Sequence, residues 1–553
     1  MDKKENINST LAVYGIQDTD DGSYPDYVHD HNITLFNGGR IIRHGALERI
    51  TRVKYDSSMP VHIFDLLKQE DLLGRFDLDL VFVDNPVGRA FINQKGNIRF
   101  EAPLNSRLAH EPEEGRAWLL DRPVKAWVVN HELAHVFSSM PFYGPFKENS
   151  LHVHFDGGAS KSNFSAWLWR NGAFSLIEGH WDLRHLSSLF NANALTFAII
   201  GAGKKDQNSM PGKFMGYSSF GRYSRKLEDW LWDNDFFSNM WGNKQPFFRQ
   251  VKKDWKKDLK GFNLENPFLQ DIAATIQHIF ERELLAKLRE LKNHTHAGYL
   301  YYSGGSALNI KANTALLESG MFRKVYIPPC TNDSGLSIGA GACLEWYKHG
   351  RVEVHTPYLN NWGLKDQMVR YTQKDLYVVA EVLVYGRVVA VCNGYGETGP
   401  RALGNRSLLA RADDPELAHW ISMDLKGREW YRPVAPVMLA RNLSRLKPAI
   451  GADELSHYML RDYQIPYLLS DPIQGALHVD GTARIQTLTS RGDNPYLYDL
   501  LDLLEKEYQV FALINTSFNA PGRPIVHTQE DAFREAREMG ILHLVVNGRH
   551  RRL

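Results

Sequence analysis

The sequence predicts a mixed α/β fold with more than one domain. Its 553 residues are too many for a single hydrophobic core, because domains usually hold about 100–200 residues. Short apolar runs that end in glycine turns alternate with segments of helical periodicity, as in strands that lead into helices. Hydrophobic residues make up 43% of the chain and charged residues 23%, which is typical of a globular protein. We therefore expect an α/β protein of two or more domains.

The charge and the cysteine content exclude several classes of protein. The formal net charge is +1, so the chain as a whole has no attraction for nucleic acid or for a membrane surface. Its three cysteines are too few and too scattered for a disulfide framework or a cysteine-rich metal site. The first residues lack the apolar core of a signal peptide, and no uncharged run approaches about 18 residues. We expect a soluble cytoplasmic protein that does not contact a membrane.

A glycine-rich segment at 391–407 is the central motif of the sequence. It follows an apolar run at 388–391 and contains four glycines and two arginines, which are Gly394, Gly396, Gly399, Gly404, Arg401 and Arg406. Glycines let bare backbone N–H groups approach an anion, and guanidinium groups fit phosphate oxygens. A glycine-rich hairpin with solvated arginines is the alternative. Three later segments, 426–433, 478–484 and 515–519, also place cations or hydroxyls beside turns, which favours a phosphate site.

Two histidines, His131 and His135, follow a predicted strand at 124–129. Four residues apart on a helix, they lie on one face, where both rings can reach one metal ion. Together with Glu132 they also form the His-Glu-x-x-His motif of zinc peptidases, in which the glutamate is the general base. The extended form of that motif is absent, because Ser138 and Pro141 stand where it needs glycine and histidine. A zinc peptidase and a pair of histidines buried in the core stay as alternatives.

Strand and turn signals surround these histidines. Short strands are predicted at 11–16, 77–84 and 151–155, and a hairpin turn at 37–40. A strand, a glycine turn and the start of a helix are predicted over 299–310, and a loop that enters a helix of small residues over 332–341. Such turns can seat a nucleotide against a helix N-terminus. A long amphipathic helix is predicted over 271–293.

Taken together, these motifs resemble the carbamoyltransferase family that includes the nodulation and antibiotic O-carbamoyltransferases. The resemblance covers nearly the whole chain. It implies an actin-like (ASKHA, Kae1-like) ATPase domain over 1–360 and a smaller YrdC-like α/β domain over 361–553. The implied activity is ATP-dependent O-carbamoylation. The YrdC-like domain would form carbamoyl adenylate from carbamoyl phosphate and ATP, and the actin-like domain would pass the carbamoyl group to a hydroxyl.

The resemblance also implies which residues bind ligands. A divalent metal, with Fe²⁺ the expected ion and Mg²⁺ accompanying ATP, would bind to His131, His135 and Asp333. Nucleotide in the actin-like domain would contact Asp156, Gly157, Gly158, Gly304, Gly305 and Asn309. Phosphates in the YrdC-like domain would bind Arg401, Arg406, Lys426, Arg432 and Arg484. The carbamoyl end would be hydrogen-bonded by Asn515 and Ser517. The catalytic residues would be Lys426, Arg432 and the base His29.

Several points stay open at this stage. The family has His-Asp followed by small residues where this chain has His29, Asp30, His31 and Asn32, so His29 is either the base or a solvated loop histidine. A threonylcarbamoyl enzyme that modifies tRNA has the same two kinds of domain and is an alternative function. The acceptor could be a small natural product, a saccharide or a hydroxymethylated nucleobase. The sequence leaves the oligomeric state open, with a homodimer as one alternative.

Two further segments carry weaker signals. Residues 211–221 resemble another turn of the family. Residues 222–261 interleave tryptophan and phenylalanine with lysine and arginine. Such a segment can stack bases and hold the phosphates of a nucleotide or nucleic-acid acceptor. The alternative is a lid that packs on the body with a charged outer face.

Overall fold

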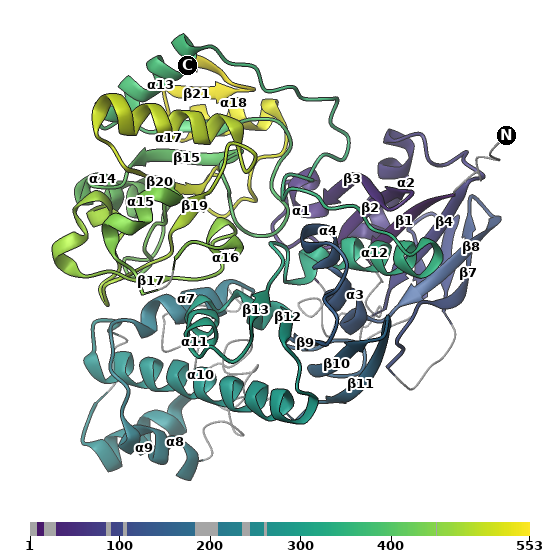
Figure 1. The fold of residues 1–553 in the computed structure, drawn as a ribbon, viewed down its shortest axis with the longest axis horizontal. Coiled ribbons are helices and arrows are strands. Elements are labelled where there is room, and N and C mark those ends of the chain that lie inside the picture. Colours follow the sequence, from purple (N-terminus) through teal and green to yellow (C-terminus); the bar gives the residue numbers. More distant parts are fainter. Residues whose placement is uncertain are drawn as a thin grey trace.

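Three large β-sheets with helices around them make up the computed structural model (Figure 1), so the mixed α/β fold is confirmed. The structure describes residues 8–15, 29–84, 90–102, 108–182, 208–234, 244–258, 263–449 and 451–553. Two sheets come from residues before 330, and the third from residues after 388. We call the residues up to 360 the N-terminal part and the rest the C-terminal part. The domain division expected at 360 stays a prediction.

The first sheet has eight strands in the order β3-β2-β1-β4-β8-β7-β6-β5. The strands are β1 Ser9–Tyr14, β2 Asn32–Asn37, β3 Arg40–Ala46, β4 Leu78–Val83, β5 Ala90–Ile92, β6 Ile98–Glu101, β7 Glu113–Leu119 and β8 Arg122–Val129. The hairpin predicted at 37–40 joins β2 to β3, and Gly38 and Gly39 supply the positive φ angles of 59° and 87° that its turn needs. The short helices α1 Leu47–Thr51 and α2 Met59–Gln69 follow β3.

The second sheet has five strands in the order β11-β10-β9-β12-β13. The strands are β9 Ser150–Phe155, β10 Phe164–Arg170, β11 Ala173–His180, β12 Tyr299–Ser303 and β13 Lys324–Tyr326. Between the two sheets lie α3 His131–Phe137 and α12 Leu336–His349, with the short α4 Met140–Tyr143 nearby. Helix α12 packs on β1, β2 and β4, whereas α3 packs on β9 and β12. The small residues predicted for α12 let the two helices touch, since a Cβ on Gly339 would lie 1.7 Å from the Ala134 carbonyl oxygen.

A group of helices covers the other face of the second sheet, at the bottom of Figure 1. It consists of α7 Met210–Ser218, α8 Arg225–Asp233, α9 Lys244–Trp255, α10 Pro267–Thr295 and α11 Ile310–Glu318. The turn expected at 211–221 is wrong, because α7 occupies most of that range. Pro211 is tolerated in the first helical turn, and Phe214 and Tyr217 bury their rings against the sheet and α10.

The aromatic and basic segment at 222–261 is only partly within the described residues. There, the Trp230 and Trp255 rings meet edge to face with their centroids 6.1 Å apart. Both rings also pack against the core beneath the second sheet. These contacts favour a packed helical layer over a set of free stacking platforms. The interleaved residues at 235–243 and 259–262 lie outside the described residues.

The third sheet has seven strands in the order β19-β16-β20-β15-β14-β21-β22. The strands are β14 Val389–Cys392, β15 Arg406–Arg411, β16 Pro436–Leu439, β19 Gln486–Leu488, β20 Ala512–Ser517, β21 His543–Val546 and β22 Arg549–Arg552. One face is covered by α13 Gln373–Val384 and α17 Pro495–Tyr508, and the other by α14 Pro415–Trp420 and α18 Gln529–Glu538. Smaller elements are α15 Ala440–Leu443, α16 Glu454–His457 and the paired strands β17 Tyr463–Gln464 and β18 Thr482–Ala483.

The C-terminal part occupies the upper left of Figure 1, and α1 lies where it meets the N-terminal part. Among the helices within the described ranges, none combines the length and the apolar character that a membrane crossing requires.

The contact between α3 and α12 yields a stability prediction. Gly339→Ala should lower the free energy of unfolding by about 1–3 kcal/mol, because its Cβ overlaps backbone that cannot move without separating the helices. The matched control is Gly212→Ala in α7, where a Cβ meets nothing within 4 Å. That change should be neutral or stabilising by up to about 1 kcal/mol, owing to the helix propensity of alanine. Urea unfolding measures both, and equal midpoints for the two variants would contradict the close packing.

Candidate active site

Four side chains converge at the N-terminal ends of α3 and α12. His131 and His135 come from α3, Asp156 follows β9, and Asp333 lies in the short 3₁₀ turn before α12. One ligand atom from each lies within 4.8 Å of the others. The two Nε2 atoms are 3.1 Å apart, and Asp333 Oδ1 lies 3.5 Å and 3.4 Å from them. Two imidazoles and two carboxylates aimed at one point fit a divalent cation. We call these four side chains the metal quartet.

The surroundings of the metal quartet hold its members in place. His131 N donates to Asp84 Oδ1 at 3.0 Å, which fixes the start of α3. Tyr14 OH donates to Asp333 Oδ2 at 2.9 Å, and burial keeps the pKa of that phenol well above its usual value. Burial by itself lowers the pKa of His135, but contacts with Asp156 and Asp333 more than offset it and raise the pKa to about 9. The site therefore concentrates negative charge where a cation would bind.

Glu132 does not face the metal quartet. It is fully buried, and its Oε1 accepts from Lys161 N at 2.6 Å and from Ser162 N at 2.9 Å. Its Oε2 accepts from Ser160 Oγ at 2.8 Å. The carboxylate thus fixes the turn between β9 and β10 and has no path to a metal-bound water. The zinc-peptidase alternative is wrong, because that chemistry needs this glutamate as its base.

Two glycine turns meet beside the metal quartet. Asp156 joins them, since its Oδ1 accepts from Gly157 N at 2.5 Å and its Oδ2 from Gly305 N at 2.7 Å. Gly304 has a φ of 98°, and a Cβ there would lie 2.2 Å from the Phe155 carbonyl oxygen. The residues expected to bind nucleotide therefore adjoin the metal quartet. Asp156, expected only as a nucleotide contact, belongs to the quartet as well.

Asn309 and Gly158 differ from the other expected nucleotide residues. The side-chain oxygen of Asn309 caps α11 by accepting from Ala312 N at 3.1 Å. Its amide also exchanges two hydrogen bonds with Gln277, at 3.0 Å and 3.1 Å. These contacts contradict a free ligand-binding role for Asn309. Gly158 lies against the Trp181 ring, where a Cβ would be 3.4 Å from the indole.

Four arginines of the C-terminal part form a second cluster, which consists of Arg401, Arg428, Arg432 and Arg484. Burial and the charges of the other three hold the pKa of Arg484 well below its usual value. Burial and the neighbouring arginines lower the pKa of Arg428 to about 9 and that of Arg401 to about 10. The buried Nε atoms of Arg401 and Arg484 have no hydrogen-bond partner. Such an arrangement fits a polyphosphate anion, which would neutralise the charges and accept these bonds.

In the glycine-rich segment at 391–407, internal contacts of the protein use several groups that were expected to bind phosphate. Buried Glu397 binds the backbone N–H groups of Leu403, Asn405 and Arg406 at 2.7–3.0 Å. These groups are therefore not free for phosphate. Arg406 is also fully buried and donates to the carbonyl oxygens of Asn393, Gly394 and His527 at 2.7–3.0 Å. It holds the loop together, and only Arg401 extends from this loop to the arginine cluster.

Lys426, Asn515 and Ser517 lie together at the end of β20. Lys426 Nζ donates to Ser517 O at 2.7 Å, Asn519 O at 2.6 Å and Asn519 Oδ1 at 2.8 Å, which uses its three donors. Lys426 thus orders the loop that follows β20. The Asn515 amide nitrogen donates to Gln486 at 2.6 Å, whereas its buried Oδ1 has no partner and is free to accept a bond from a ligand.

His29 lies between the metal quartet and the arginine cluster. Its Nδ1 is 3.0 Å from Asp30 Oδ2, which also accepts from Asn332 Nδ2 at 3.2 Å, one residue before Asp333. On the other side its ring meets that of Tyr55, with centroids 6.3 Å apart. The charges of Arg432 and Arg401 act on Tyr55. Burial lowers the pKa of His29, but Asp30 more than offsets this and raises it to about 9.

Sequence reasoning missed three residues of these sites. Arg428 lies within the segment at 426–433 that was singled out, two residues after Lys426, and its Nη2 donates to Thr516 Oγ1 at 2.7 Å. Asp156 was expected to contact nucleotide, but its place in the metal quartet was not expected. Nothing in the sequence marks Tyr14, because its partner Asp333 lies 319 residues away.

Known proteins are similar to this chain along nearly all of its length. Two family models match, the carbamoyltransferase N-terminus over residues 118–343 and the carbamoyltransferase C-terminus over residues 380–551. Nodulation protein U of Azorhizobium caulinodans is 36% identical over 72% of this chain and 72% of its own length. The 3'-hydroxymethylcephem-O-carbamoyltransferase of Streptomyces clavuligerus is 26% identical over 94% of this chain and 96% of its own.

Solved structures are less similar. Full-length HypF aligns with 63% of this chain and 47% of its own, at 13% identity and a TM-score of 0.31, which establishes neither fold nor function. The two family models and the Azorhizobium relative are decisive: the chain belongs to the carbamoyltransferase family, and it is a transferase.

Proposed function

We propose that this transferase is an ATP-dependent O-carbamoyltransferase. It forms carbamoyl adenylate from carbamoyl phosphate and ATP in a YrdC-like C-terminal domain. An actin-like N-terminal domain then passes the carbamoyl group to the hydroxyl of an acceptor. The observation that carries this proposal is the arginine cluster, in which the buried Nε atoms of Arg401 and Arg484 have no partner, while Arg432 pairs with Glu429 at 3.1 Å. A Streptomyces relative that spans 94% of the chain is named for carbamoyl transfer to oxygen, which supports the same reaction.

The arginine cluster suits the first half-reaction. ATP and carbamoyl phosphate bring dense negative charge. Water would hydrolyse carbamoyl phosphate to carbamate and phosphate, and the carbamate oxygen would then attack the α-phosphorus of ATP and release pyrophosphate. Fixed guanidinium groups stabilise the charge that develops on these leaving groups without having to reorganise. The unpaired Nε atoms of Arg401 and Arg484 would donate to phosphate oxygens. The free Oδ1 of Asn515 would accept from the carbamoyl NH₂ group, and Ser517 lies at the same end of β20.

The N-terminal part suits the transfer step. His29 would take the proton of the acceptor hydroxyl on Nε2, while Asp30 holds its Nδ1. The metal quartet would hold a divalent cation, for which imidazole and carboxylate ligands fit Fe²⁺, and which would supply Lewis acidity to the carbonyl. The turns at 157–158 and 304–305 would approach the nucleotide, with Mg²⁺ accompanying ATP.

The direct test is to incubate the protein with ATP, carbamoyl phosphate and a panel of acceptors. The panel should include small natural-product alcohols, saccharides and hydroxymethylated nucleobases or nucleotides. Mass spectrometry should detect the gain of one carbamoyl group on one class, and only when both ATP and carbamoyl phosphate are present. Absence of carbamoyl-phosphate-dependent ATP–pyrophosphate exchange would refute the proposal without depending on the acceptor.

The metal quartet should be separable from adenylate formation. His131→Ala removes one imidazole from a four-ligand site, so metal content per chain should fall to background in elemental analysis. Transfer should be lost, while carbamoyl-phosphate-dependent pyrophosphate exchange should persist, because that chemistry uses the other cluster. His110→Ala, at an exposed position, is the control and should retain its metal. Full metal content in His131→Ala would show that the quartet is not the site.

Arg432 should act only in the first half-reaction. A planar fork can bind two phosphate oxygens, whereas lysine offers one point charge. Arg432→Lys should therefore slow pyrophosphate exchange roughly a hundredfold, or about 3 kcal/mol, the usual cost of one fixed charge-assisted contact in a protected site. Transfer from separately supplied carbamoyl adenylate should be spared. The control is Arg441→Lys, a surface arginine paired with Asp502 and Glu505. If Arg432→Lys slowed pyrophosphate exchange and transfer equally, the two half-reactions would not be separated between the C-terminal and N-terminal parts.

The pH dependence of transfer should report on His29. Only the neutral imidazole can take a proton, so transfer from supplied adenylate should rise with pH until the pKa of about 9 is passed. Asp30→Asn removes the carboxylate that raises this pKa, so the rising limb should move to lower pH. The pH profile of pyrophosphate exchange should not move. An unshifted transfer limb in Asp30→Asn would exclude His29 as the base.

A further inference from the structure

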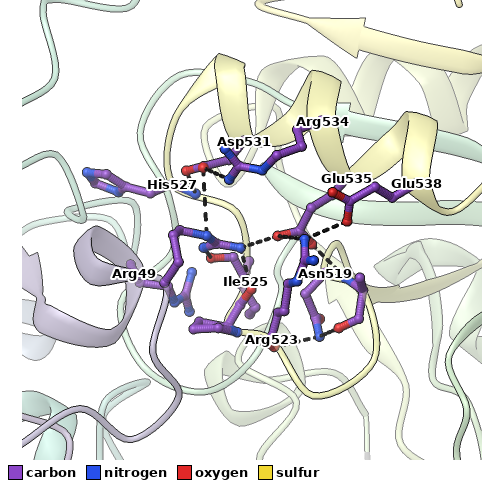
Figure 2. Close-up of polar contacts among 12 residues, drawn as sticks. Arg49, Asn519, Arg523, Ile525, His527, Asp531, Arg534, Glu535 and Glu538 are labelled. Carbon is purple, nitrogen blue, oxygen red and sulfur yellow. Dashed lines mark hydrogen bonds and ion pairs between the residues drawn. The ribbon is translucent and has the colours of Figure 1, made fainter.

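A short segment of the N-terminal part, residues 47–56, reaches across to the C-terminal part. It begins at α1, where Leu47 N donates to His31 O at 2.8 Å. Arg49 is buried and donates through Nη2 to Gly399 O at 3.0 Å, two residues before Arg401. Figure 2 shows Arg49 on this segment opposite the C-terminal loop and α18. The segment therefore contacts one of the loops that carry the arginine cluster.

The strongest crossing contact is made by Arg52, the residue that ends α1 with a φ of 65°. Its Nη1 donates to Ile525 O at 2.5 Å, and its Nη2 to Pro524 O at 2.8 Å and to the Glu535 carboxylate. A second carboxylate oxygen, Asp531 Oδ1, lies 3.7 Å from its Nε. One guanidinium thus binds two carbonyls of a loop and a carboxylate of α18, all in the C-terminal part.

These contacts continue through the loop to Lys426. Glu535 is fully buried, and its Oε2 accepts from Ala520 N at 2.6 Å. Asn519 ties the same loop to itself by donating to Arg523 O at 2.8 Å. Asn519 and Ser517 then accept the bonds from Lys426 Nζ. An unbroken chain of charged and backbone hydrogen bonds therefore joins Arg52 to the end of β20, where the carbamoyl group is proposed to bind.

The same segment also borders the transfer site. Glu48 Oε2 accepts from Tyr55 N at 3.1 Å, and Tyr55 has a left-handed φ of 57° that this contact helps to hold. The Tyr55 ring meets His29. His31 N, in turn, donates to Asp56 O at 3.0 Å. Residues 47–56 therefore touch the neighbourhood of His29 at one end and the loop at 519–525 in the middle.

We propose that Arg52 is a positioning residue for adenylate formation. Acting through Glu535 and the carbonyls of Pro524 and Ile525, it fixes the loop at 519–525 and with it Lys426, so that the N-terminal part sets the geometry of the C-terminal site. The role assigned to the site rests on the proposed function, whereas the coupling itself rests on the contacts alone. Arginine is required because one planar fork reaches both carbonyls and the carboxylate, which an ammonium group cannot do.

The test compares Arg52→Lys with a matched control, Arg534→Ala. Arg534 pairs with Asp531 from within α18 and is about half exposed, so its loss removes a cation from the same acidic pair without crossing between the parts. Hydrogen–deuterium exchange should accelerate in the peptide covering 517–526 for Arg52→Lys, because the amides of Ala520 and Val526 depend on the loop. The control should match the wild type.

Activity gives a second, independent readout. Losing part of a charge-assisted fork should raise the KM for carbamoyl phosphate in pyrophosphate exchange roughly tenfold or more. Transfer from supplied adenylate should change much less. Glu535→Gln should reproduce the faster amide exchange and the KM effect, and adding Arg52→Lys to it should change little further, since both act on one contact.

The outcomes distinguish the positioning role of Arg52 from the proposed function. Unchanged amide exchange at 517–526 in a folded Arg52→Lys protein would overturn the positioning role. So would additive effects of Arg52→Lys and Glu535→Gln. Wild-type protein without pyrophosphate exchange, combined with faster amide exchange in Arg52→Lys, would refute the proposed function and leave the coupling in place. Thermal unfolding of every variant shows that each is folded at the assay temperature.

Discussion

The arrangement of buried charge is the constraint on which the C-terminal site depends. Burial and the charges of neighbouring arginines lower the pKa values of Arg401, Arg428 and Arg484, and bringing such like charges together costs free energy. Glu429 pairs with Arg432, but two other carboxylates of the C-terminal part, Glu397 and Glu535, form their hydrogen bonds elsewhere. Glu397 binds the N–H groups of its own loop, and Glu535 binds Arg52 and Ala520 N. The fold thus reserves the positive charge of the cluster for an anion that it does not supply itself.

Carboxylates have the same structural role in the N-terminal and C-terminal parts, where they accept hydrogen bonds from the backbone. Glu132, Glu397 and Asp156 each accept hydrogen bonds from backbone N–H groups of a turn. A carboxylate that accepts two or three such bonds holds the backbone of the loop in one conformation. The loops beside the sites are therefore held by internal contacts of the protein. This explains why motifs rich in glycine and acidic residues surround the sites even where they do not contact a ligand.

The sequence was sufficient for several strands, among them β4, β8 and β9, for the long helix α10 and for the histidine pair of the metal quartet. The His131 and His135 pair could be found because helical spacing is local, whereas Asp333 came from the resemblance to the carbamoyltransferase family, which places a metal ligand there. The errors share one cause. Arg406, Asn309 and Glu132 each carry the chemistry of a ligand-binding group, and each is used by a structural partner instead. Those partners lie up to 121 residues away, which no local pattern reveals. Arg52 escaped notice for the same reason, since its partner Glu535 is 483 residues away.

The position of residues 47–56 bears on how two chemical steps can share one protein. Carbamoyl adenylate, the proposed intermediate, is a mixed anhydride that hydrolyses if water reaches it before the acceptor does. The proposed sites of its formation and of transfer must therefore keep a fixed relative position. A flexible linker would not provide this, because it leaves the relative position of the two sites free. Residues 47–56 instead bind the C-terminal part through Arg49 and Arg52 while they border His29 through Tyr55. A displacement of either site therefore strains contacts at the other, and in the proposed mechanism the geometry of transfer would follow from the same contacts that order the loop at 519–525.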